Sequence, residues 1–218
     1  MNKKPFDPSL DGAKTNFKTV MSYGDYLNID TVLDQQNCIT GAHDEMLFIV
    51  QHQTSELWLK QILHEMLAAR TALETGNMPN MLKMLSRVSR IFEQLNNQWD
   101  VLRTMTPADY THFRDALGPS SGFQSYQYRM VEFILGNRNP AMLKPHSHVP
   151  KVEKMLQLEL SRTSFYDEVI KFLFNTLDGT TKDMPVPQLD TPHEGRPSVQ
   201  ERWKIVRSEW NEIIQQTI

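Results

Sequence analysis

A stripe of apolar residues between positions 81 and 102 is the feature that most constrains the fold of this chain. Its members are separated by alternating steps of four and three residues: Met81, Leu85, Val88, Phe92, Leu95, Trp99 and Leu102. This spacing is typical of a helix that packs lengthwise against other helices. We therefore predict one helix over about residues 79–103, with the stripe in the core.

Other segments carry their own helix signals. A long helix is predicted over about residues 44–75, because Gly76 is a typical residue to follow a helix. In "TPAD", Thr106 can cap a short helix, Pro107 suits its first turn and Asp109 can close a capping box. Further helices are predicted over about 123–135, 150–160 and 164–177, and another from Ser198 with Trp203 and Trp210 on its apolar face. Without a strand pattern, the predicted class is all-α, a bundle of long antiparallel helices.

Polar and proline-rich segments divide the chain. Residues 1–20 are predicted to form a flexible N-terminal arm, and residues 21–218 a single all-α domain of catalytic type. Residues 136–150 read as a loop, and residues 178–197, with four prolines and two glycines, as a long connection. The apolar stripe of the last predicted helix continues to the end of the sequence. We therefore expect that a C-terminal part of the domain is missing, or that a partner covers this surface.

Composition excludes several classes of protein. The chain has 218 residues and a net charge of −3, with 23 basic and 26 acidic residues spread along it. This distribution gives no support to a nucleic-acid or membrane partner. The sequence shows neither a signal peptide nor an apolar run of membrane-spanning length, so we expect a cytoplasmic protein. The only cysteine, Cys38, excludes an internal disulfide, and we expect it to be a buried thiol.

Metal-binding patterns are scarce. No glutamate has a histidine three residues later, which argues against a di-iron bundle, and there is no His-Glu-x-x-His motif. The "HSH" at 146–148 lies in the predicted loop 136–150 and could hold a metal, but histidines in surface loops usually hold none.

Two pairs of residues could carry chemistry. Phe48 and His52 are four apart in a predicted helix and share a face, so His52 is either a satisfied core histidine or a group aimed into a pocket. Tyr110 and Arg114 are also four apart, and a guanidinium beside a phenol can bind a carboxylate. Alternatively, Arg114 extends along the surface to pair with a nearby aspartate. "GPSSG" (118–122) could offer backbone N–H groups to an anion, or be only a turn.

Five separated motifs together resemble one family. They are "YGDYL" (23–27), "FIVQHQTSELWLK" (48–60), "QLNNQWDVL" (94–102), "TPADYTHFRDALGPSSGFQSYQYR" (106–129) and "EFILGNRNP" (132–140). In this order they resemble the tryptophan 2,3-dioxygenases, densely over about residues 21–145 and loosely elsewhere. The resemblance implies an all-α homotetramer that binds haem b. It also implies insertion of both atoms of O₂ into the indole C2–C3 bond of L-tryptophan. The product is N-formylkynurenine, at the first step of the kynurenine pathway of tryptophan catabolism.

The resemblance also implies roles for individual residues. His52 is the catalytic distal histidine that accepts a hydrogen bond from the indole N–H, and Phe48 packs on the indole. Arg114 and Tyr110 hold the substrate carboxylate. The other implied substrate contacts are Ile49, Val50, Gln51 and Leu117, with Tyr23, Tyr26 and Leu27 reaching into a neighbouring subunit's site. Ser121 and Trp99 are the implied haem contacts.

One part of the family's pattern is not found. The family's proximal haem histidine lies on a helix after the part that resembles residues 198–218. Beyond Arg129 only His146, His148 and His193 remain, all in predicted loops, so no iron ligand is assigned. The chain is then a dioxygenase whose sequence is cut short, a non-catalytic indole- or haem-binding member, or a helical scaffold with a decayed pocket. The joint presence of Phe48, His52, Tyr110 and Arg114 weighs against the scaffold.

Overall fold

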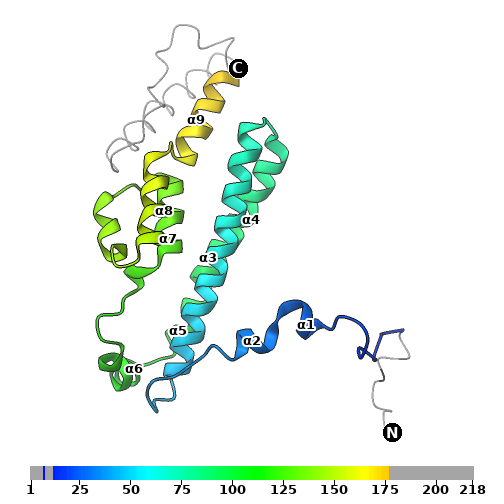
Figure 1. The fold of residues 1–218 in the computed structure, drawn as a ribbon, viewed down its shortest axis with the longest axis vertical. Helices are drawn as coiled ribbons and strands as arrows, with labels where there is room; N and C mark the ends of the chain where they lie inside the picture. The colour runs from blue at the N-terminus through cyan, green and yellow to red at the C-terminus, as the bar shows by residue number, and fades with distance from the viewer. Residues whose placement is uncertain (1–6, 8–11, 177–218) are drawn as a thin grey trace.

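Two long antiparallel helices form the centre of the structure, a computed structural model that describes residue 7 and residues 12–176 (Figure 1). The first helix, α3, spans Glu45–Glu74 and the second, α4, spans Met78–Asn97. The turn between them contains Gly76 with a φ of +71°, a conformation that glycine adopts at little cost. The side chain of Asn77 then caps α4 by accepting from the backbone N–H of Asn80. The predicted end of the first helix at Gly76 is confirmed.

The helix predicted over residues 79–103 is interrupted near its end. α4 stops at Asn97, and a separate short helix, α5, spans Trp99–Leu102. Met81 and Val88 of the stripe are buried, as predicted, but Trp99 is 52% exposed. The prediction that Trp99 lies in the core is therefore wrong, because Trp99 belongs to the separate short helix α5, which buries none of its residues.

A second group of helices packs on this hairpin. It comprises α7 (Tyr126–Leu135), α8 (Pro150–Ser161) and α9 (Phe165–Thr176), and α3 contacts both α7 and α9 (Figure 1). The core between them includes Ile62 and Met66 of α3, Phe133 and Ile134 of α7, and Leu156 of α8, none with measurable exposure. Residues 12–176 contain helices and connecting segments without a strand, which confirms the predicted all-α class.

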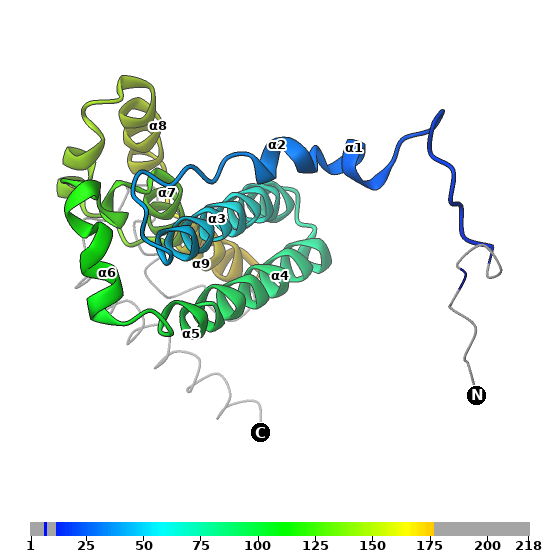
Figure 2. The same cartoon turned by 90° about the horizontal axis from the view of Figure 1, so that it is seen from below.

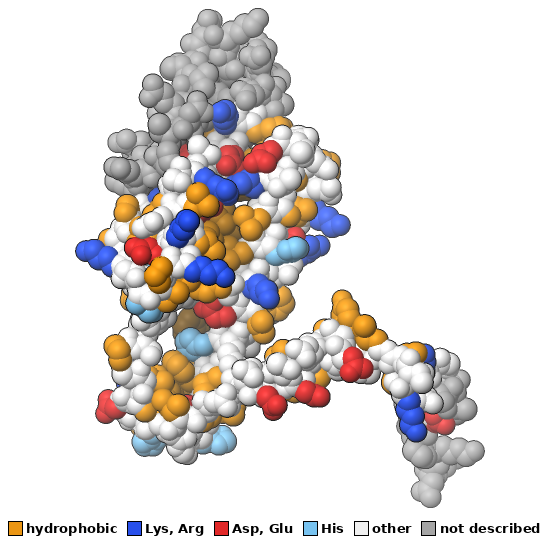
Figure 3. All heavy atoms as spheres, viewed as in Figure 1, with side chains coloured by type: hydrophobic (Ala, Val, Ile, Leu, Met, Phe, Trp, Pro, Cys, Tyr) orange, Lys and Arg blue, Asp and Glu red, His pale blue; other side chains and the backbone are white. Residues whose placement is uncertain are grey.

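The N-terminal segment projects away from the bundle. Its two short helices are α1 (Tyr23–Leu27) and α2 (Ile29–Leu33), and no residue from 12 to 44 is buried (Figure 2). Cys38 in this region is exposed, so the expectation of a buried thiol is wrong. Along α1 and α2, hydrophobic side chains lie mainly on one side and acidic ones on the other (Figure 3).

The segment predicted as a loop over residues 136–150 contains a 3₁₀ helix. This helix, η4, spans Pro140–His146 and begins where the side chain of Asn139 accepts from the N–H of Ala141. His146 is only 3% exposed, so the interpretation of "HSH" as two surface histidines is wrong for this residue, although His148 is exposed. The predicted connection 178–197, His193 and the last predicted helix with Trp203 and Trp210 lie outside the described residues.

A buried ionic cluster connects the two groups of helices. Arg70 of α3 donates through Nη2 to Glu159 of α8 at 2.8 Å and through Nε to Glu168 of α9 at 3.1 Å. The side chains of Arg70 and Glu159 are 8% and 6% exposed. Burial raises the pKa of Glu168, which Arg70 opposes. Arg70 thus hydrogen-bonds both carboxylates, and the Thr163 hydroxyl donates to Glu168 as well.

We predict that Arg70→Met destabilises the fold by about 3 kcal/mol or more, because it leaves the buried Glu159 carboxylate without its hydrogen-bonded ion partner. The matched control is Arg90→Met, which removes the exposed pair of Arg90 and Glu93 and is expected to change stability by less than about 1 kcal/mol. The measurement is the free energy of unfolding in urea. Equal losses in the two variants would show that the buried cluster contributes no more than a surface pair.

His146 makes stability depend on pH. Its Nε2 is buried without a hydrogen-bond partner among the described residues, and burial, Arg129 and His148 together lower its pKa. The unfolded chain therefore binds a proton more readily than the folded chain. The contribution of neutral His146 to stability is thus present above the ordinary histidine pKa of about 6.5 and is lost as pH falls.

We predict that His146→Gln flattens the fall in unfolding free energy between pH 7.5 and 5.5. An unchanged pH slope in the variant would exclude His146 as its source.

Candidate functional site

The first turn of α3 is fixed by a buried carboxylate. Glu45 is 1% exposed and accepts hydrogen bonds from the backbone N–H of Ile39 at 2.7 Å, the N–H of Thr40 at 2.8 Å and the Thr40 hydroxyl. The Thr40 hydroxyl is the main group that lowers the pKa of Glu45, which favours the charged form. This cluster holds residues 39–44 against the start of α3 and fixes the part of the helix that carries Phe48 and His52.

His52 is held with one ring nitrogen free. Its Nδ1 lies 2.7 Å from the carbonyl oxygen of Phe48, and the two rings are 4.1 Å apart between centroids. A carbonyl oxygen can only accept, so Nδ1 carries the proton and Nε2 of the neutral ring is left as an acceptor. His52 is exposed, which contradicts its interpretation as a core histidine.

The short helix α6, Pro107–Arg114, presents the second pair. Its predicted capping box is confirmed: Thr106 accepts from the N–H of Asp109, and Asp109 accepts from the N–H of Thr106. The Thr106 hydroxyl is the main cause of the lowered pKa of Asp109. Arg114 Nη1 donates to the carbonyl oxygen of Gly118 at 2.9 Å. This observed partner is a backbone carbonyl and not the nearby aspartate of the alternative interpretation.

Three aromatic rings bring α3 and α6 together. The ring centroid of Phe48 lies 5.9 Å from that of Tyr110 and 5.5 Å from that of Phe113, and the last two are 5.4 Å apart. Figures 1 and 2 show α6 at the end of the bundle where α3 begins. Phe48, His52 and Tyr110, predicted from two separate motifs, therefore lie in one cluster. Sequence reasoning assigned no role to Phe113, although its position three residues after Tyr110 places both on one helical face.

The other predicted substrate contacts on α3 are Ile49, Val50 and Gln51, and they differ in burial. Gln51 is 8% exposed and faces the interior, whereas Ile49 is half-buried. Val50, which is exposed, lines a hollow between α2 and α3. Because neighbouring positions on a helix point about 100° apart, the four consecutive residues 48–51 cannot all face one ligand.

The remaining predicted site residues lie on three other short elements, two 3₁₀ helices and α1. Leu117 is half-buried in the 3₁₀ helix η2, Asp115–Leu117. Ser121 accepts from the N–H of Phe123 and caps the 3₁₀ helix η3, Gly122–Gln124, so "GPSSG" is a capped turn. Tyr23 and Tyr26 are each 76% exposed on the projecting α1, where Leu27 is 40% exposed.

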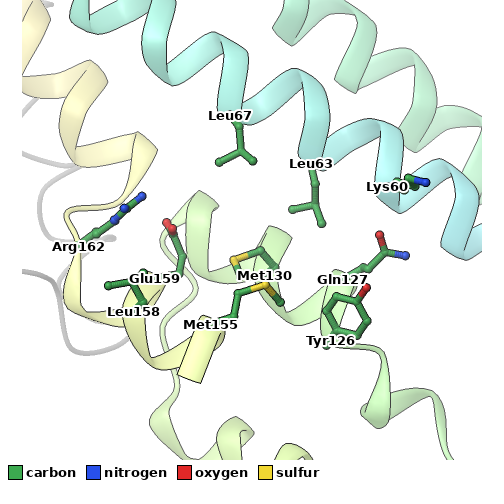
Figure 4. A pocket seen from close by; sticks show the side chains of 10 residues that line it. All are labelled: Lys60, Leu63, Leu67, Tyr126, Gln127, Met130, Met155, Leu158, Glu159 and Arg162. Atoms are coloured by element: carbon green, nitrogen blue, oxygen red, sulfur yellow. The ribbon is translucent and has the colours of Figure 1, made fainter. Parts of the chain in front are cut away.

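A separate cavity of about 490 Å³ lies between α3, α7 and α8 (Figure 4). Met130 and Met155 meet at its centre, with Lys60 and Arg162 at opposite ends. None of the predicted site residues lines it; the lining residues are Lys60, Leu63, Leu67, Tyr126, Gln127, Met130, Met155, Leu158, Glu159 and Arg162.

The described residues contain neither a cluster of metal-binding side chains nor a membrane-spanning helix. Within residues 12–176, no group of three or more histidine, cysteine, aspartate or glutamate side chains is arranged to hold a metal ion. In the same range, no helix combines the length and the apolar character needed to cross a membrane.

Comparison with known proteins identifies the family. The family model described as tryptophan 2,3-dioxygenase matches residues 8–164. A protein of Ruegeria sp. (strain TM1040) named tryptophan 2,3-dioxygenase is 64% identical over 203 residues, which cover 93% of this chain and 73% of that protein. Another of the same name, from Bradyrhizobium sp. (strain BTAi1 / ATCC BAA-1182), is 54% identical over 197 residues, 88% of this chain and 71% of that protein. This chain belongs to the tryptophan 2,3-dioxygenase family.

Proposed function

We propose that this protein oxidises L-tryptophan with O₂ to N-formylkynurenine, the first step of the kynurenine pathway. Family membership supports the reaction. The observation that carries the assignment of the site is that Phe48 contacts both His52 on its own helix α3 and Tyr110 on α6. A non-catalytic indole-binding protein is not favoured, because the relatives compared above all bear the name of the enzyme.

The α3 side of the cluster suits an indole ring. Phe48 offers an aromatic surface, and aromatic rings attract one another in tilted or offset arrangements. His52 Nε2, left as an acceptor by the bond from Nδ1 to the Phe48 carbonyl, can take a hydrogen bond from the indole N–H. A pocket that pairs this N–H discriminates against side chains without it, because its acceptor would otherwise stay unpaired.

The α6 side suits the amino-acid end of the substrate. A guanidinium has five N–H donors, and the bond from Arg114 Nη1 to the Gly118 carbonyl uses one of them. The rest can bind a carboxylate in a fork, with the Tyr110 hydroxyl as a further donor. Leu117, Ile49, Val50 and Gln51 remain proposed contacts.

The same region can accept the substrate-facing side of a haem, on which the family depends. Trp99 is 52% exposed and Phe123 is 64% exposed, so both leave aromatic surface uncovered. The Ser121 oxygen accepts from Phe123 N–H, which leaves its O–H hydrogen free to donate. Ser121 and Trp99 are therefore the residues that would contact the group. When bound, a haem supplies the iron that binds O₂.

The proposal also covers the oligomeric state of the protein and its location in the cell. Tyr23, Tyr26 and Leu27 lie on α1, which buries no residue, so a homotetramer in which they enter a neighbouring subunit's site would cover them. The exposed free thiol of Cys38 suits a reducing compartment, and we propose that the protein is cytoplasmic.

The direct test of the reaction is to load the full chain with haem and assay N-formylkynurenine from L-tryptophan in air. We expect product from the native chain and a loss of about a hundredfold or more in His52→Ala, because the indole N–H then loses its acceptor. The exposed position of His52 predicts that the variant folds normally. Loss of the far-ultraviolet circular dichroism of the helices in His52→Ala would instead make His52 structural, and undiminished turnover would remove it from the site.

Arg114→Lys tests the carboxylate end separately. A lysine keeps the charge but not the planar fork, so we expect weaker binding of L-tryptophan by about tenfold and little change for indole, which has no carboxylate. The measurement is the dissociation constant of each ligand by calorimetry. Equal losses for tryptophan and indole would remove Arg114 from carboxylate binding.

A further inference from the structure

Phe113 is the main attachment of α6 to the rest of the protein. It is the one buried residue of α6, with 1% of its surface exposed. The other side chains of this helix are half-buried or exposed, including Tyr110 and Arg114. The position of the helix that carries both proposed carboxylate ligands therefore depends on where this ring is seated.

The ring of Phe113 is seated by contacts in two directions. Its plane is inclined 61° to that of Phe48, across the junction of the two helices, and 89° to that of Tyr110 on its own helix. Edge-to-face contacts of this kind depend on both distance and orientation. Phe113 thus touches the aromatic wall of the proposed indole end and the phenol of the proposed carboxylate end at the same time.

We propose that Phe113 is a positioning residue that sets the separation between the indole-binding and carboxylate-binding ends of the site. This inference rests on the proposed function. Phe113 contacts neither end of the substrate itself; it acts through Phe48 and Tyr110. Its ring is the spacer that makes the site selective for a ligand carrying an indole and a carboxylate at the spacing found in tryptophan.

Shortening the Phe113 side chain should affect two kinds of ligand differently. A ligand that engages both ends gains from the second contact only if the two ends are correctly spaced, and a misplacement of about 1 Å removes much of that gain. A ligand that engages the indole end alone is not affected by the spacing. Shortening Phe113 should therefore lower selectivity for the two-ended ligand, in addition to any loss of stability.

The experiment compares L-tryptophan with tryptamine, which has the indole and the amine but no carboxylate. Their dissociation constants are measured by calorimetry on the full haem-loaded chain, native and with Phe113→Leu. We expect the native chain to prefer tryptophan and Phe113→Leu to lose about tenfold of that preference, the size of a charge-assisted contact. In the Phe113→Leu background, Arg114→Lys should then have little further effect on tryptophan.

The matched control is Phe133→Leu. Phe133 is equally buried, with 0% exposure, but lies in α7 within the main core. Both Phe→Leu variants should lower the melting temperature, whereas only the change at Phe113 should alter the ratio of the two dissociation constants. Should Phe113→Leu fail to fold, Phe113→Met provides the same comparison, because the unbranched methionine side chain adapts more readily to the space that the ring leaves.

The outcomes separate this inference from the proposed function. A native chain that binds tryptophan and tryptamine equally has no carboxylate end, which overturns both. A selective native chain whose preference survives in Phe113→Leu or Phe113→Met keeps the proposed function and overturns the role of Phe113. A loss of preference in Phe133→Leu as large as that in Phe113→Leu would show a general effect of destabilisation and also overturn it.

Discussion

The packing of Phe113 against Phe48 and Tyr110 is the contact on which the site depends. α3 is part of the core, but α6 is a helix of eight residues that buries a single side chain. Without this aromatic contact, the two pairs of residues that could bind an amino acid would lie on elements with no fixed relation. Burial of one ring thus converts two local sequence patterns into one site.

The rest of the fold keeps α3 in place. Its N-terminal end is fixed by Glu45, which accepts hydrogen bonds from Ile39 and Thr40. Farther along, Arg70 connects it to Glu159 and Glu168 of the other helices. The apolar core with α4, α7 and α8 extends along α3 from Leu59 to Leu73. A helix restrained at both places is a rigid support for the side chains at positions 48 and 52, and rigid supports are what binding sites require.

Local sequence rules predicted several helix boundaries correctly. The end of the first long helix at Gly76 and the capping box of Thr106 with Asp109 follow from rules that involve a few adjacent residues, and both are present. Tertiary packing decided the rest. The interruption after Asn97, the exposure of Trp99 and the burial of His146 in η4 are features of the tertiary structure, and no local pattern in the sequence indicates them. For the same reason, the i, i+4 pairs could be read from sequence, but their meeting through Phe113 could not.

A crystal structure of the haem-loaded chain with L-tryptophan tests the central claim most directly. The account predicts the indole ring against Phe48, with its nitrogen within about 3 Å of His52 Nε2 and the carboxylate on Arg114. A tryptophan bound elsewhere, for example in the cavity between α3, α7 and α8, would contradict it, as would a carboxylate that faces His52 and leaves Arg114 on the Gly118 carbonyl alone.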